Sequence, residues 1–157
     1  MSELEVRIVM LEPMRVASVH GFGESPEERA WEKLIAWAKP KGLVDDLETH
    51  RIFGFNNPDP SPASPNYGYE FWMVVGAGME PEGEVRIKEF AGGLYAVARC
   101  EAGGEPWETI PATWKRLGAW VEDSKYRWAP HQWLEEHIGD VDRPEGLILD
   151  LYFPIAE

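Results

Sequence analysis

The chain has little cysteine, little positive charge and no long apolar run. Its single cysteine, Cys100, excludes an internal disulfide framework and fits a reducing compartment. Fifteen basic residues stand against 28 acidic ones, so the net charge is −13 and the basic face needed for sequence-independent nucleic-acid binding is missing. No signal-like leader or membrane-spanning segment is found. We therefore expect a soluble, cytoplasmic protein that contacts neither nucleic acid nor membrane.

Tryptophan, in contrast, is abundant, with eight residues in a chain of 157. A tryptophan ring is costly to bury unless its N–H group finds a partner, so we expect some of these rings to line a pocket. A chain of this length buries roughly two thirds of its unfolded surface on folding. The sequence therefore fits a single domain over residues 1–157.

Two segments of the sequence occur twice. Glu5–Ile8 (EVRI) returns 79 residues later as Glu84–Ile87, and the WxxLxAW pattern of Trp31–Trp37 returns 83 residues later as Trp114–Trp120. We interpret the chain as two pseudo-repeats, 1–78 and 79–157, that form one α+β domain because neither repeat can bury its apolar faces alone. The seam between two such sheet halves is a natural place for a ligand.

Both repeats show the same order of predicted elements. Strands are expected at 5–10, 15–20, 51–55 and 67–75, and again at 85–90, 94–100, 133–138 and 147–153. The first helix is expected to run from Ser25, as the capping residue, to about residue 38, with Pro26 at its first position. The second is expected from about Thr109 to Trp120, because Pro111 is tolerated only near a helix start.

Side-chain alternation places an acid beside an aromatic residue in each repeat. Glu70 shares a strand face with Trp72, and Asp150 shares one with Tyr152, both on the side away from the helices. A carboxylate among aromatic rings attracts a lipophilic cation, by roughly 0.5 to 2 kcal/mol per ring. The alternative is a solvated strand acid beside structural aromatics.

The segment 133–138 supplies further candidates. The same counting groups Trp133, Glu135 and His137 on one face and leaves Glu136 on the helix side. A β-bulge would exchange the roles of Glu135 and Glu136. A metal site is not expected, because His131 and His137 lie roughly 20 Å apart along a strand. No cofactor motif is found either.

Several segments together resemble the GyrI-like small-molecule-binding domain, which is also the effector-binding domain of multidrug-responsive AraC- and MerR-type regulators. The resemblance rests on the segments 51–55, 67–72, 114–120, 134–138 and 151–155. It implies tandem strand-helix-strand-strand (SHS2-like) modules in antiparallel sheets, with two long helices and a central aromatic cleft. The family's buried glutamate maps onto Glu135, and His137 stands where tyrosine is usual. The regulators' helix-turn-helix has no counterpart here.

The resemblance favours a standalone protein that binds lipophilic, cationic or polyaromatic compounds for drug or toxin sensing or sequestration, as a monomer or homodimer. One alternative is a hydrolase of cyclopropane-type DNA-alkylating compounds, with Glu135, Glu70 or His137 as the acid or base. Another is a protein inhibitor of DNA gyrase. The expected ligand-binding residues are Glu135, Trp72, Glu70, Trp133, His137, Tyr152, Phe55 and Tyr67.

Overall fold

The computed structural model describes residues 4–46, 48–56, 66–101, 105–138 and 148–157. The chain forms two compact units. One unit is continuous and covers residues 14–90; we call it the 14–90 unit. The other combines residues 1–13 with residues 91–157, and we call it the split unit. Within the described residues, no helix is both long enough and apolar enough to cross a membrane.

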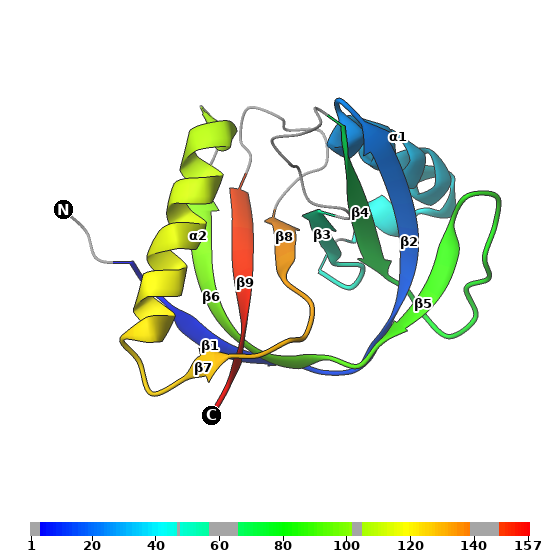
Figure 1. The fold of residues 1–157 in the computed structure, drawn as a ribbon. Helices are drawn as coiled ribbons and strands as arrows, with labels where there is room; N and C mark the ends of the chain where they lie inside the picture. Colours follow the sequence, from blue (N-terminus) through cyan, green and yellow to red (C-terminus); the bar gives the residue numbers. More distant parts are fainter. Residues whose placement is uncertain (1–3, 47, 57–65, 102–104, 139–147) are drawn as a thin grey trace. The chain divides into compact units, whose positions relative to one another are not determined.

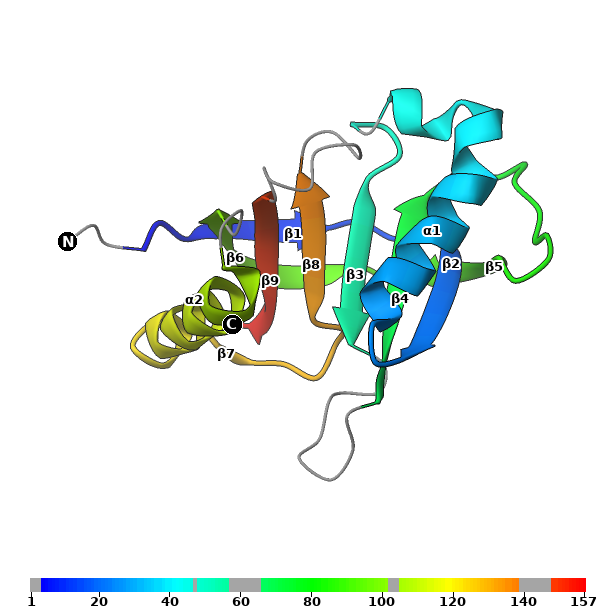
Figure 2. The ribbon, with the colours of Figure 1, turned by 90° about the horizontal axis from the view of Figure 1, so that it is seen from above.

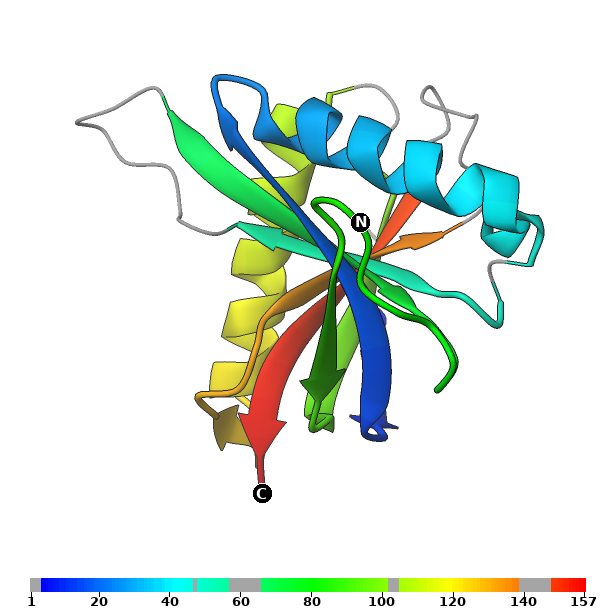
Figure 3. The ribbon, with the colours of Figure 1, turned by 90° about the vertical axis from the view of Figure 1, so that its right-hand side faces the viewer.

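The 14–90 unit is a four-stranded antiparallel sheet with one helix on one of its faces (Figure 1). Its sheet has the order β3-β4-β2-β5. Helix α1 packs against β2 and β4, and Figure 3 shows it crossing these strands. The elements are β2 (Met14–Gly23), α1 (Pro26–Ala38), the 3-10 helices Lys39–Lys41 and Leu43–Asp45, β3 (Ile52–Asn56), β4 (Tyr67–Val74) and β5 (Arg86–Phe90).

The split unit has the same plan. Its antiparallel strands have the order β1-β6-β9-β8, and the short β7 pairs with the end of β9. Helix α2 packs against β6 and β9 (Figure 2). The elements are β1 (Arg7–Leu11), β6 (Gly93–Glu101), α2 (Pro106–Glu122), β7 (Arg127–Trp128), β8 (Leu134–Ile138) and β9 (Ile148–Ala156).

Each unit takes one edge strand from the sequence repeat that supplies most of the other unit. Strand β1 belongs to the first pseudo-repeat but pairs with β6, from Arg7 opposite Val97 to Leu11 opposite Gly93. Strand β5 belongs to the second pseudo-repeat but pairs with β2. The repeated EVRI segment therefore leads into the edge strand of both sheets, and the pairing boundary between the units differs from the expected repeat boundary at residue 79.

Each helix buries the stripe that its sequence spacing predicts. In α1 the buried positions include Ala30, Leu34 and Trp37, which recur every three to four residues. In α2, Leu117 and Val121 pack into a core cluster that includes β9 residue Leu151. A fully buried leucine such as Leu34 or Leu117 contributes roughly 2 kcal/mol of hydrophobic stabilisation. These stripes hold each helix on one face and leave the other sheet face helix-free.

The start of α2 differs from the prediction. The helix begins at Pro106, not near Thr109, and the carbonyl of Glu105 accepts hydrogen bonds from the amides of Glu108 and Thr109. Pro106 occupies the first helical position, where its missing N–H costs nothing. Pro111 consequently lies inside the helix, where one backbone hydrogen bond is lost. Ser25 precedes α1 as expected, but its hydroxyl makes no capping bond.

Candidate functional site

The helix-free face of the 14–90 unit gathers aromatic residues around a carboxylate. Strand pairing sets Phe55 opposite Glu70, and Ser18 opposite Trp72. The rings of Phe55 and Trp72 have centroids 4.8 Å apart, and those of Trp72 and Phe90 are 5.2 Å apart. Three of the expected ligand-binding residues, Phe55, Glu70 and Trp72, are thus on one face.

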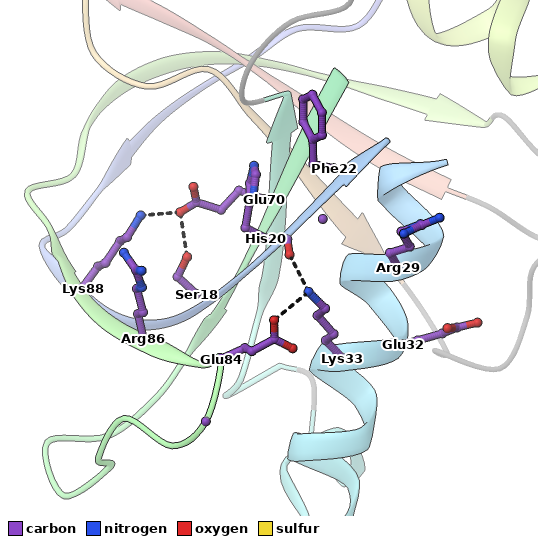
Figure 4. A pocket seen from close by; sticks show the side chains of 12 residues that line it. Ser18, His20, Phe22, Arg29, Glu32, Lys33, Glu70, Glu84, Arg86 and Lys88 are labelled. Atoms are coloured by element: carbon purple, nitrogen blue, oxygen red, sulfur yellow. Dashed lines mark hydrogen bonds and ion pairs between the residues drawn. The ribbon is translucent and has the colours of Figure 1, made fainter. Parts of the chain in front are cut away.

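Glu70 is buried, and one of its oxygens accepts three hydrogen bonds. The donors to Oε2 are the Ser18 hydroxyl at 2.7 Å, the Trp72 indole N–H at 2.6 Å and the Lys88 ammonium at 2.7 Å. The pair with Lys88 balances the charge of a side chain that is only 4% exposed (Figure 4). Glu70 therefore fixes the orientation of the Trp72 ring and ties β5 to β4.

Tyr67 lies on the opposite face of the same sheet. Its hydroxyl donates a hydrogen bond of 2.5 Å to Glu27 of α1. Burial, followed by the Glu27 carboxylate, raises the pKa of Tyr67 above its ordinary value. Tyr67 thus connects helix to sheet and does not share the face of Trp72.

The helix-free face of the split unit carries a second set of acids and rings. Pairing sets Glu136 opposite Asp150 and Leu134 opposite Tyr152. The Tyr152 hydroxyl donates a 2.6 Å hydrogen bond to Glu136, whose exposed fraction is 7%. The Tyr95 ring lies 5.4 Å from that of Tyr152, edge to face. A buried carboxylate and two phenol rings therefore meet on this face.

Asp150, the predicted counterpart of Glu70, is satisfied by arginines. Arg7 of β1 and Arg99 of β6 each place a guanidinium nitrogen 2.8 Å from its carboxylate. This hydrogen bonding with Asp150 raises the pKa of Arg99. Because Asp150 is 3% exposed, the two arginines provide the charge balance that its burial requires.

The sequence assignment of the two faces of β8 is wrong. Glu135 and His137 pair opposite Leu151 and Leu149, which belong to the core under α2, so they lie on the helix side. The Trp114 indole of α2 donates to Glu135 at 3.0 Å. Glu136 is instead on the helix-free side. The prediction failed because the buried side chains of β8, Leu134 and Glu136, lie on the helix-free face, whereas Glu135 and His137 on the helix side are partly buried, so apolar character does not identify the helix side.

Trp133 joins Glu135 on the helix side. Its ring centroid is 5.4 Å from that of Trp114 and 4.5 Å from that of Phe153. The three rings form an edge-to-face cluster beside α2. Burial lowers the pKa of His137 to about 4, so its imidazole is neutral near pH 7. Trp133, Glu135 and His137 are thus together, as expected, but separated from Tyr152 by the thickness of the sheet.

A hollow of about 980 Å³ opens in the 14–90 unit, and the sequence did not predict it. It forms where β2 continues beyond its last pair with β5, Ser18 opposite Arg86. Strand β2, helix α1 and the start of β5 form its walls (Figure 4). The one sequence signal for it is the EVRI repeat, because Glu84 and Arg86 both line the hollow.

The remaining sequence candidates have structural contacts. His131 Nε2 lies 2.8 Å from the carbonyl oxygen of Leu94. Burial raises the pKa of the Cys100 thiol, which lies 3.4 Å from the Thr113 hydroxyl. Across the described ranges, no three His, Cys, Asp or Glu side chains are placed to hold a metal ion.

The sequence model of the GyrI-like small molecule binding domain matches residues 4–156, so the chain belongs to this family. Among curated protein sequences, none matches the chain.

Solved structures share the fold at low sequence identity. The C-terminal domain of EcmrR matches with a TM-score of 0.68 and 16% identity, over 98% of each chain. In the EcmrR–DNA complex the match, with a TM-score of 0.70 and 14% identity, covers 98% of this chain but 57% of the EcmrR chain. This chain therefore spans little more than half the length of the EcmrR chain.

Two further solved structures share this fold. A hydrolase encoded by lin2189 from Listeria innocua matches with a TM-score of 0.71 and 12% identity, covering 98% of this chain and 93% of that one. SAV2435, solved bound to tetraphenylphosphonium, matches with a TM-score of 0.56 and 11% identity, covering 98% and 94%. At these identities the likeness concerns the fold.

Proposed function

We propose that this GyrI-like domain binds lipophilic small molecules that are cationic or polyaromatic, through the helix-free faces of its sheets. The observation that carries the proposal is that these faces combine aromatic rings with buried carboxylates. Phe55, Trp72 and Phe90 supply rings in one unit, and Tyr95 and Tyr152 supply them in the other. Ring faces and a poorly solvated carboxylate attract an organic cation together.

We assign different roles to the carboxylates on these faces. Glu70 and Asp150 are each matched by basic side chains of their own unit, which makes them structural acids. We assign the ligand's charge to Glu136, because it is buried beside the Tyr152 ring on a helix-free face. Glu135, the residue that the family resemblance favours, is the second candidate. SAV2435, a protein of the same fold, is known with a bound organic cation, which supports this ligand class.

A thermal-shift titration tests the proposal. Tetraphenylphosphonium at 100 times its Kd would stabilise the protein by about 2.7 kcal/mol and raise its Tm by several degrees. Glu136→Gln removes one charge, and we expect it to abolish most of this shift. Glu89→Gln is the control, because Glu89 is an exposed acid whose partner is Arg15 at 2.9 Å. Its shift should equal that of the wild type.

Two comparisons could contradict the proposal. Neutral triphenylphosphine oxide should raise the Tm far less, and an equal rise would remove the charge argument. If Glu135→Gln lost the shift and Glu136→Gln kept it, the site would lie on the helix side of β8. Hydrolysis of electrophilic compounds and inhibition of gyrase remain alternatives from the family resemblance; product analysis after incubation with an electrophilic cyclopropane separates turnover from binding.

A further inference from the structure

The arginine of the EVRI repeat has a different role in each unit. In the split unit Arg7 donates to Asp150 at 2.8 Å. In the 14–90 unit its counterpart is Arg86, and the counterpart acid, Glu70, is paired with Lys88 instead. Within the described part of the chain, Arg86 has no hydrogen bond or ion pair from its guanidinium. The same motif thus has a structural arginine in one unit and an uncommitted one in the other.

The uncommitted arginine faces the hollow of the 14–90 unit. Figure 4 shows Arg86 beside Lys88 and Ser18 on one wall. On the opposite wall Lys33 donates to Glu84 and to the backbone carbonyl of His20, both at 3.2 Å. Lys33 and Lys88 are therefore engaged with carboxylates, and the charge of Arg86 stays available.

The hollow has a local excess of positive charge in a strongly acidic protein. Its charged lining consists of Arg29, Lys33, Arg86 and Lys88 against Glu32, Glu70 and Glu84. The formal sum is therefore +1, whereas the whole chain carries −13. Arg29 and Glu32 lie one turn apart on α1, so their charges offset each other in part. The positive charge that remains in the hollow is therefore that of Arg86.

The edge of β2 adds a backbone donor. The Arg15 carbonyl accepts a hydrogen bond from the amide of Val75. The backbone N–H and C=O groups of Arg15, and of every second residue after it in β2, therefore point toward β4. The groups of His20 and Phe22 then point to the other side, beyond the last residue that β5 covers. The Lys33 bond to the His20 carbonyl agrees with this direction. The N–H of Phe22 faces the hollow, and its ring is 52% exposed.

We propose that this hollow binds the oxyanion group of a small organic molecule, a carboxylate or a phosphate, with Arg86 as the principal ligand. The planar guanidinium matches two oxygens of either group. The Phe22 amide lies along the same wall, whereas the Ser18 hydroxyl already donates to Glu70. The exposed Phe22 ring contacts an apolar or aromatic portion of the ligand. Arg86 lies on the helix-free face of the 14–90 sheet, since Ser18 pairs with both Trp72 and Arg86, and the hollow takes a ligand of opposite charge to the one assigned to Glu136.

Titration with phenyl phosphate, followed by amide chemical shifts, tests the site. We expect saturable shifts at Ser18, Phe22 and Arg86, weaker binding at higher salt, and at least a tenfold loss of affinity in Arg86→Gln. Benzoate in a parallel titration tells whether the site prefers phosphate or carboxylate. Benzyl alcohol, which has no charge, should leave the shifts unchanged.

The repeat supplies a matched control. Arg7→Gln removes the equivalent arginine of the split unit, so we expect lower stability with unchanged phenyl phosphate binding. Arg86→Gln should melt like the wild type and lose binding. The site is refuted if Arg86→Gln binds normally, if benzyl alcohol gives the same shifts, or if Arg86→Gln is destabilised as much as Arg7→Gln. Glu136→Gln should bind phenyl phosphate normally, which separates this test from that of the cation proposal.

Discussion

The buried carboxylates of this protein are stabilised by hydrogen-bond donors of different kinds. Glu70 accepts from a hydroxyl, an indole and an ammonium, whereas Asp150 accepts from two guanidinium groups. Removing one partner of a buried charge destabilises the fold by about 3 to 5 kcal/mol. The local donors of each acid, more than its burial alone, therefore determine how it stabilises the fold.

At the scale of single residues, the lowered pKa of His137 predicts that the stability of the protein depends on pH. Its folded pKa of about 4 lies below the ordinary value of 6.5, so the unfolded chain binds more protons between these values. The free energy of unfolding should therefore fall as the pH is lowered from 6.5 to 4, by on the order of 3 kcal/mol for this group. Urea denaturation across this range measures the slope.

The matched variant is His137→Gln, which removes the titrating group and should flatten part of that slope. Leu149→Ala lowers stability without removing a titratable group and should keep the full slope. An unchanged slope in His137→Gln would show that His137 is not protonated differently in the folded and unfolded states.

At the scale of elements, two glycines differ in how closely a neighbouring side chain approaches them. Gly118 lies inside α2, and an added Cβ would meet the Phe153 ring at an ordinary 3.5 Å. Gly54 lies in β3, and a Cβ there would collide with the Tyr69 ring. One glycine thus weakens its helix without a steric need, and the other makes room for a packed aromatic side chain.

These environments predict opposite effects of the same substitution. Gly118→Ala should stabilise the protein by up to about 1 kcal/mol, because alanine has the higher helix propensity and the site has room. Gly54→Ala should destabilise it by about 1 to 3 kcal/mol through overpacking against Tyr69. Chemical denaturation of both variants measures the two signs; destabilisation by Gly118→Ala would mean that the helix surface there is more crowded than the structure shows.

At the scale of the molecule, the exchanged edge strands decide which parts of the chain depend on each other. Strand β1 covers the edge of β6 and brings Arg7 to Asp150. Strand β5 does the same for β2 and brings Lys88 to Glu70. Each sheet therefore receives both an edge strand and a balancing charge from the other sequence repeat.

Deleting residues 1–11 should therefore weaken the split unit selectively. We expect amide hydrogen exchange in β6 and β9 to accelerate at least about tenfold, because β6 loses its partner strand and Asp150 loses Arg7. Exchange in β2 and β4 should be unchanged. Deletion of residues 1–3 alone is the control, and equal acceleration in both units would contradict the pairing described here.

Sequence patterns predicted most elements but not how their faces and edges are used. Alternation correctly grouped Glu70 with Trp72, because a strand's period is fixed by its backbone. It assigned Glu136 to the wrong side, because β8 buries a leucine and a glutamate on its helix-free face, so polarity does not indicate which face the helix covers. The hollow at Arg86 was missed because it depends on where β5 stops beside β2, which is a long-range property that local periodicity does not encode.

The pairing of Leu11 with Gly93 has a further consequence for how the gene can be divided. Residues 14–90 are inserted between two strands that already run side by side, so the split unit has the connectivity of a host domain and the 14–90 unit that of a guest. A fragment cut at the repeat boundary would separate both sheets from their edge strands. A fragment that joins residue 13 directly to residue 91 would close β1 and β6 into a hairpin and keep every strand of the host.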